Sequence, residues 1–306
     1  MTRYTVTHTT TYSYDEDVTD SFGIAHVVPR ELPWQHVGNV DVRVDPAPSD
    51  VNSDTDYYGN PVTYFQVTEP HRRLEVRAVS AVEVLTPSYD ESGFGVPWEV
   101  ARPLVRPELP GAWRATDLAV ASALVEHTEE AEAYGDLSLT PGRPLMEAAE
   151  DLMHRVHRDF SYDKTATTVS STVGEIFEAK GGVCQDFAHL MLACLRSHGL
   201  AARYVSGYLA TEPPPGRERL VGADASHAWV ALWVPPLVDP VDTAGGQWVA
   251  LDPTNDQRAD DRYVTVAWGR DYADVPPVKG VIFTEAKRST LAVSVDVAPE
   301  EEDAVR

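Results

Sequence analysis

The spacing of apolar residues changes from that of strands to that of helices partway along the chain, and this change limits the possible fold more than any other feature. From Tyr4 to Tyr14, and again from Leu74 to Val84, apolar or aromatic side chains alternate with polar ones. Shorter segments rich in β-branched and aromatic residues lie at 40–44 and 62–68. A period of two residues predicts strands that are buried on one face. We therefore expect the first hundred residues to form a β-sandwich-like domain.

After a Pro-rich stretch at 97–110, the period becomes that of a helix. An apolar stripe predicts one helix over 145–160, behind Pro144. A second, strongly apolar helix is predicted from about Cys184 to His198, with Gly199 after its end. Helices that follow a run of strands indicate an α+β protein.

Shorter elements complete the second part of the chain. Thr172 and Glu175 have the spacing of a capping box, so they predict a short helix, which we expect Gly181 and Gly182 to end. Apolar segments predict strands at 203–209, 227–234, 247–251 and 291–297. The segment TEPPPGRER at 211–219 is predicted to be a surface loop, and PEEEDAVR at 299–306 a frayed acidic tail.

With 306 residues, the chain is long enough for two domains. We expect an N-terminal β-domain over 1–105, where the Pro-rich stretch marks the boundary. A second domain of helices and strands is expected over 106–275. Residues 276–306 remain as a C-terminal strand and tail.

The charge of the chain excludes several classes of partner. Acidic residues outnumber Lys and Arg by 48 to 25, which gives a formal net charge of −23. Nucleic acids and anionic membranes are therefore unlikely partners, because both need clustered basic side chains. Peptides, including basic ones, remain favoured. The sequence shows neither a signal peptide nor an apolar run long enough for a membrane span, so we expect a cytoplasmic protein.

The two cysteines, Cys184 and Cys194, differ in their expected roles. If both lie on one helix, their separation along its axis is roughly 15 Å, too far for a disulfide. Cys184 stands at the start of the apolar helix, after two glycines, in the segment GGVCQDFAHLML. A helix N-terminus stabilises the thiolate, which is the nucleophilic form of cysteine. Cys194 is best interpreted as a packing residue.

Two further segments supply partners for a nucleophile. His227 begins the strand in ASHAWVALWV, and Asp252 ends the next strand in QWVALDPTN. If these strands are neighbours, the carboxylate can orient the imidazole, which can then pair with the Cys184 thiolate. Each residue also has a plainer interpretation: Cys184 as a buried cysteine, His227 as a strand-end histidine and Asp252 as a turn residue.

Taken together, these segments resemble the transglutaminase-like superfamily of papain-like cysteine enzymes. The resemblance rests on GVCQDFA, ARYVSGY, SHAWV and WVALDPTN, and covers roughly 145–275. YTVTHTTTYSY and YYGNPVTYF resemble the β-domain that precedes this core in a bacterial subfamily. The resemblance implies a papain-like fold with Cys184 as nucleophile, His227 as base and Asp252 as the orienting acid.

The resemblance also points to residues that line the site. Tyr162 is similar in position to an aromatic residue upstream of the family nucleophile. Gln185 follows Cys184, where the animal enzymes have Trp, and this difference argues against calcium-dependent crosslinking. Asp186 and His189 are expected to point away from the Cys184 stripe. His154 and His157 are spaced as a pair but lack a third ligand, so we expect neither a metal nor a cofactor.

Several functions remain open at this stage. The preferred reaction is thioester-forming acyl chemistry on an amide, leading to hydrolysis of a peptide or isopeptide bond. Transfer of the acyl group to an amine, as in a protein-glutamine transamidase, uses the same three residues. Transfer from coenzyme A is disfavoured because the acidic chain would repel a phosphate-bearing carrier. A peptide-binding or assembly module without turnover is the non-enzymatic alternative. The oligomeric state is not predicted.

Overall fold

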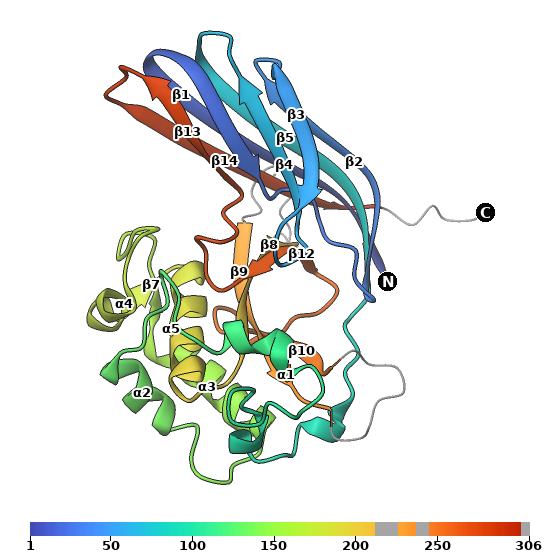
Figure 1. Ribbon diagram of the computed structural model, residues 1–306, viewed down its shortest axis with the longest axis vertical. Helices are drawn as coiled ribbons and strands as arrows, with labels where there is room; N and C mark the ends of the chain where they lie inside the picture. Colours follow the sequence, from blue (N-terminus) through green and yellow to red (C-terminus); the bar gives the residue numbers. More distant parts are fainter. Residues whose placement is uncertain (212–225, 237–244, 301–306) are drawn as a thin grey trace, which may run out of the picture.

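The computed structural model describes residues 1–211, 226–236 and 245–300. It has two lobes, a long sheet and a mixed α/β lobe that packs beneath it (Figure 1). The predicted loop at 211–219 and the predicted tail at 299–306 fall mostly outside the described residues. The α+β class, with an N-terminal β-domain and a papain-like core, is confirmed.

A single seven-stranded sheet forms the upper lobe, rather than two separate sheets. Its centre is β1 (Thr2–Ala25), a strand of 24 residues. The other six strands are β2 (Gln35–Asp45), β3 (Asp50–Thr55), β4 (Pro61–Val67), β5 (His71–Val84), β13 (Val278–Thr284) and β14 (Ser289–Pro299). All the pairings in this sheet are antiparallel.

β1 is paired in two halves, because its register shifts between Ser13 and Val18. The first half pairs with β5 and β14, and the second half pairs with β4 and β13. Residues 278–299, expected to be a separate C-terminal segment, therefore lie in the same sheet as the N-terminus. Figure 1 shows this sheet with blue and red strands side by side.

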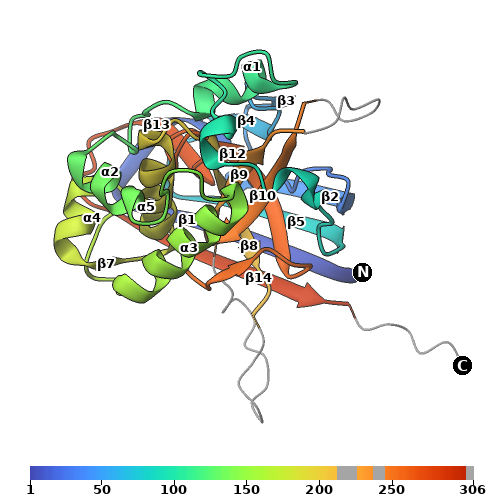
Figure 2. The ribbon, with the colours of Figure 1, turned by 90° about the horizontal axis from the view of Figure 1, so that it is seen from below.

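The lower lobe is built around α5 (Cys184–Ser197), whose residues from Gln185 to Arg196 are all buried. Around it lie α2 (Glu129–Asp136), α3 (Leu145–Asp159) and α4 (Val173–Ala179), and Figure 2 shows these helices gathered on one side of the lobe. Short elements lead into this lobe: η1 (Glu91–Gly93), η2 (Trp98–Ala101), α1 (Ala112–Ala115) and η3 (Thr116–Leu118). None of the described helices is long and apolar enough to cross a membrane.

One predicted helix end is wrong. Lys180, not a glycine, ends α4 in the left-handed conformation, with φ of 52°. The capping box of Thr172 and Glu175 at its start is confirmed. Gly181 and Gly182 instead form β7, which pairs with β6 (Ser161–Tyr162). A side chain at Gly181 would collide with the Ser161 carbonyl oxygen, 2.9 Å from its Cβ position, so the glycine serves this close pairing.

A five-stranded antiparallel sheet completes the lower lobe, in the order β11-β10-β9-β8-β12. Its strands are β8 (Ala202–Leu209), β9 (Ser226–Val234), β10 (Gln247–Asp252), β11 (Gln257–Arg258) and β12 (Tyr263–Gly269). β9 is buried on both faces, because α5 covers one, and on the other Trp229 and Ala231 pack in a second apolar cluster with Ala250 and Tyr263. This double burial explains its nearly continuous apolar sequence.

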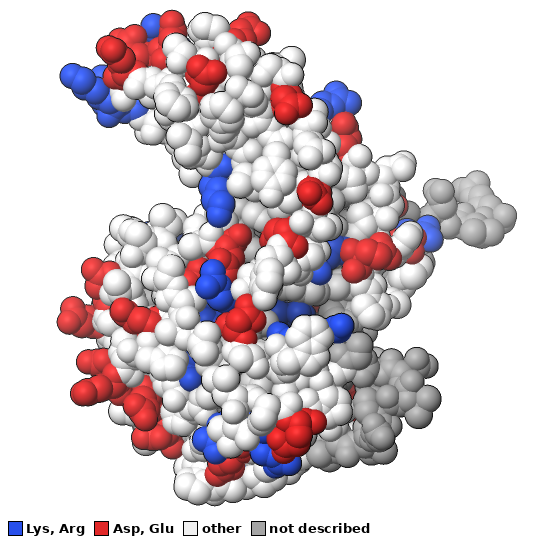
Figure 3. Space-filling view, viewed as in Figure 1, with Lys and Arg blue, Asp and Glu red and all other residues white. Residues whose placement is uncertain are grey.

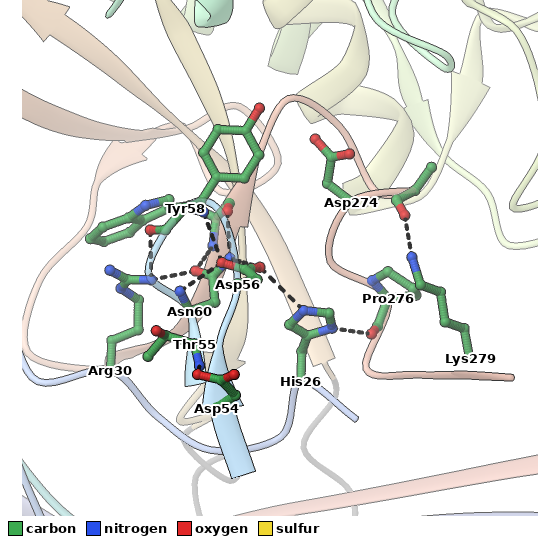
Figure 4. A network of polar contacts seen from close by, with 12 residues as sticks. His26, Arg30, Asp54, Thr55, Asp56, Tyr58, Asn60, Asp274, Pro276 and Lys279 are labelled. Carbon is green, nitrogen blue, oxygen red and sulfur yellow. Dashed lines mark hydrogen bonds and ion pairs between the residues drawn. The ribbon is translucent and has the colours of Figure 1, made fainter. Parts of the chain in front are cut away.

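The two lobes share one hydrophobic core. Tyr4 and Val6 of β1, together with Val295 and Val297 of β14, belong to the same buried cluster as the apolar face of α5. Beside this core, Asn60 joins the β3–β4 turn to β12 through two hydrogen bonds with the backbone of Trp268, 2.8 and 2.9 Å long. In Figure 4, Asn60 lies within a larger polar network that includes Asp56 and His26. The sheet is thus fixed to the lower lobe by both apolar and polar contacts.

Candidate active site

Cys184 is the first residue of α5, and the backbone before it is held by the helix's own acid. The Asp186 carboxylate accepts hydrogen bonds from the Val183 N–H at 2.7 Å and from the Thr167 hydroxyl at 2.6 Å. Burial raises the pKa of Asp186, while these two bonds act to lower it. The carboxylate is therefore engaged with the helix start.

A glycine before Cys184 is required by this arrangement. A Cβ at Gly182 would lie 2.5 Å from the Asp186 Oδ2 atom and 2.7 Å from its Cβ atom. Such distances are too short for non-bonded carbon and oxygen atoms. The GGVC segment thus combines a tight approach of the chain with a helix N-terminus, a setting that favours negative charge.

The three residues predicted to act together lie on adjacent elements. His227 is at the start of β9 and Asp252 at the end of β10, and these strands pair in antiparallel fashion. The His227 Nε2 atom is 2.7 Å from Asp252 Oδ2. The Cys184 side chain lies beside the same ring and acts to raise the pKa of His227. Because Nε2 faces the carboxylate, Nδ1 is the ring nitrogen left for the sulfur.

The environment of His227 favours its charged form. Burial lowers the pKa of His227, but the hydrogen bonds to Asp252 and Cys184 outweigh burial and raise the pKa to about 10. These partners favour the protonated ring, which has a carboxylate on one side and the sulfur on the other. Trp229 lies beside the ring, with centroids 6.0 Å apart and planes inclined by 31°.

Asp252 is fully buried and is held by residues that the sequence did not single out. Its Oδ2 atom accepts hydrogen bonds from the Tyr263 hydroxyl and the Asn255 amide, both at 2.7 Å. Its Oδ1 atom accepts from the Thr254 N–H at 2.8 Å. Burial raises the pKa of Asp252, yet these donors and His227 lower it overall. Asn255 could have been found from its place three residues after Asp252, whereas Tyr263 gave no local signal.

His154 and His157 brace the turn behind Asp252. His154 bonds to the Asp256 carboxylate, and His157 lies 3.0 Å from the Thr254 carbonyl oxygen. Their i, i+3 spacing on α3 therefore serves packing against this turn. Among the residues that the structure describes, no group of three or more His, Cys, Asp or Glu side chains could hold a metal ion.

The second cysteine and the nearby histidine are buried away from this arrangement. Cys194 is fully buried, and burial raises the pKa of its thiol to about 12. His189 is also fully buried; burial lowers its pKa to about 4, and its Nε2 accepts a hydrogen bond from the Tyr272 N–H at 3.2 Å. Cys184, which is partly exposed, is thus the accessible thiol of the two.

Cys184 and His227 open into a cleft of about 390 Å³ that lies between the two lobes. Tyr162 and Gln185 both line it, at the positions that the sequence suggested. The Gln185 amide donates to the Val169 carbonyl oxygen at 2.9 Å, so this side chain also fixes the loop that borders the cleft. The opposite wall comes from β1, β13 and β14. Figure 3 shows the molecule hollowed between sheet and lower lobe.

Comparison with known proteins supports the sequence resemblance. Residues 4–83 match the bacterial transglutaminase-like N-terminal region, and residues 136–253 match the transglutaminase-like superfamily. A protein of Mycobacterium tuberculosis is 46% identical over 99% of this chain and 95% of its own length. The chain belongs to the transglutaminase-like superfamily.

Two further proteins are similar to a smaller part of the chain or to its fold alone. A protein-glutamine gamma-glutamyltransferase of Pseudomonas aeruginosa is 34% identical, but over 32% of this chain and 14% of its own length. A solved structure from Cytophaga hutchinsonii, named as a proposed cysteine protease, has a TM-score of 0.75 at 19% identity. It covers 99% of this chain and 92% of its own, so the whole two-lobed fold is shared.

Proposed function

We propose that the protein carries out cysteine-dependent acyl chemistry on an amide, with hydrolysis of a peptide or isopeptide bond as the reaction. The arrangement that carries this proposal is Cys184 beside His227 in one cleft, with His227 hydrogen-bonded to the buried Asp252. In a cysteine–histidine pair of this kind, the sulfur is the nucleophile and the protonated imidazole is the proton donor. The Cytophaga relative's name as a proposed protease agrees with this choice.

In the first half-reaction, the Cys184 thiolate attacks the amide carbonyl carbon. N–H groups at the start of α5 stabilise the negative oxygen of the tetrahedral intermediate. The His227 imidazolium donates its proton to the amide nitrogen, the C–N bond breaks and a thioester forms. In the second half-reaction, neutral His227 takes a proton from water, which attacks the thioester and releases a carboxylic acid. The C–S bond breaks and the thiolate–imidazolium pair is restored.

Transamidation is the second candidate function, since the region shared with the Pseudomonas glutamyltransferase spans about a third of the chain. An amine would then attack the thioester in place of water. Incubating a peptide library with and without an amine acceptor separates the two reactions by the mass of the products. Free acids support hydrolysis, and amine adducts formed in preference to acids overturn it.

Alkylation with iodoacetamide tests the nucleophile itself. At neutral pH we expect Cys184 to react faster than a free thiol, and buried Cys194 to remain unmodified. Cys184→Ala should remove both the alkylation and all turnover, while Cys194→Ala serves as the matched control. Alkylation of Cys184 at the rate of a free thiol, without turnover of any peptide, would instead support a binding module.

A further inference from the structure

The lining of the cleft has a different charge from the rest of the chain. Although the sequence contains 48 acidic residues, no Asp or Glu is found among the described residues that line this cleft. Lys164 brings a positive charge to the cleft, while His227 and Cys184 face each other as the proposed pair of opposite charges. Figure 3 shows acidic side chains on the outer edge of the lower lobe and at the far end of the sheet.

Apolar and aromatic side chains make up most of the two walls. The sheet contributes Tyr12 from β1 and Leu291 and Val293 from β14. The loop side contributes Tyr162 and Val169. Four of these five are large side chains exposed to solvent by about half or more: Leu291 by 58%, Val293 by 49%, Tyr162 by 54% and Val169 by 66%. Exposed apolar groups gathered around a cleft are typical of a binding site.

We propose that this cleft selects an extended peptide segment with a large apolar or aromatic side chain, and without a positive charge, next to the reacting carbonyl. This inference rests on the proposed acyl chemistry, because the segment is the acyl part of the substrate. Leu291 and Val293 are then specificity-determining residues. They come from a strand more than 100 residues beyond Cys184 in the sequence.

The physical reason is the cost of placing a charge in such a cleft. Among the described residues of the lining, a Lys or Arg side chain would lose water without gaining a carboxylate partner, and would face the positive charge of Lys164. A Phe or Leu side chain would instead bury apolar surface against both walls. The net charge of the chain attracts cations from a distance, but the groups at contact decide which residue binds. The net charge alone favours basic peptides, whereas the cleft disfavours a basic side chain next to the reacting carbonyl.

Three matched peptidyl chloromethyl ketones, with Phe, Lys or Asp beside the reactive group, test the proposal on the full chain. The measured quantity is the rate constant for labelling of Cys184, followed by mass spectrometry. We expect the Phe probe to react at least about tenfold faster than the Lys probe. Leu291→Asp should slow the Phe probe and speed the Lys probe. Lys164→Glu, on the opposite side, should also speed the Lys probe.

Val281→Asp is the matched control, because Val281 is 63% exposed on β13 and lines a different hollow. It should leave all three rates unchanged. Equal rates for the three probes, a faster Lys probe, or labelling by none of them while iodoacetamide still alkylates Cys184 would overturn the specificity proposal and leave the acyl chemistry in place. Failure of the acyl chemistry shows itself differently, as Cys184 that iodoacetamide modifies no faster than a free thiol.

Discussion

His8 is a buried histidine of β1 that links the stability of the fold to pH. Its side chain is fully buried beside Tyr208, and burial lowers its pKa to about 4. Its Nε2 lies 2.8 Å from the hydroxyl of Thr10, which lines the cleft. A neutral imidazole therefore contacts a residue of the wall that faces Cys184.

Acid should destabilise the protein through this residue. Between pH 6.5 and about 4, the unfolded chain binds a proton at His8 that the native state does not bind, so stability falls as the pH falls. Above pH 6.5 the residue is neutral in both states. The free energy of unfolding, measured in urea, should fall between pH 7.5 and pH 4.5 by about 2 kcal/mol less in His8→Gln than in the wild type. The surface variant His127→Gln should lose as much stability as the wild type. The prediction is contradicted if His8→Gln loses the same free energy of unfolding as the wild type between the two pH values.

Asp252 should control the protonation of His227. Replacing its carboxylate by an amide in Asp252→Asn removes the negative charge that favours the imidazolium. The pKa of His227, raised to about 10 in the wild type, should then fall by about 1–3 units. Titration of the His227 ring nitrogens by NMR measures this shift. Asp260→Asn, on the loop before Tyr263, is the control, and an unchanged His227 titration in Asp252→Asn would refute the role.

Sequence reasoning located these residues because their signals are local. A cysteine after two glycines, a histidine at a strand start and an acid at a strand end can each be read within ten residues. The two side chains that donate hydrogen bonds to Asp252 differ in the same way, because one is near it in the sequence and the other is not. Asn255 stands within the same turn as Asp252, whereas Tyr263 reaches the carboxylate from another strand.

At the scale of elements, the start of α5 requires a residue without a Cβ atom at position 182. Gly182→Ala would place a Cβ atom 2.5 Å from the Asp186 carboxylate, and would force this side chain off the Val183 N–H. We expect a loss of about 1–3 kcal/mol in the free energy of unfolding, measured in urea. Gly174→Ala is the control, because a Cβ there meets no atom within 4 Å. Equal stabilities of the two variants would show that the helix start tolerates the change.

Helix positions were predictable from the sequence, but the pairing of strands was not. The stripe over 145–160 and the apolar segment from Cys184 each contain their own periodicity, so α3 and α5 appear within a residue or two of their predicted ends. The partner of a strand carries no such local signal. Tyr4 pairs with Pro299 across nearly the whole chain, and this pairing makes the wall that faces Cys184.

At the scale of the whole molecule, Asn60 is one of the polar contacts that join the sheet to the lower lobe. Its fully buried amide bonds to both backbone groups of Trp268, to Asp56 and to Arg30. Trp268 is itself held between Arg30 and Arg203, whose guanidinium carbons lie 3.6 and 3.5 Å from its ring centre. Loss of the amide would leave several buried groups without partners.

Asn60→Ala should therefore lower the free energy of unfolding by about 2–4 kcal/mol. It should also speed hydrogen exchange at the Trp268 amide, since that N–H donates to Asn60. Urea unfolding and amide exchange measure the two effects. Asn52→Ala, on exposed β3, is the matched control. Exchange at Trp268 that stays at the wild-type rate would show that the lobes are held without this tie.

The placement of β14 also has a consequence for how the protein is made. A ribosome completes Cys184, His227 and Asp252 before it reaches residues 289–299, so the chemical groups exist while one wall of the cleft is still missing. Until β14 arrives, the first half of β1 has an edge without its final partner. A nascent chain thus acquires its selectivity last, and an early stop after residue 284 would leave the thiol in a site open on one side.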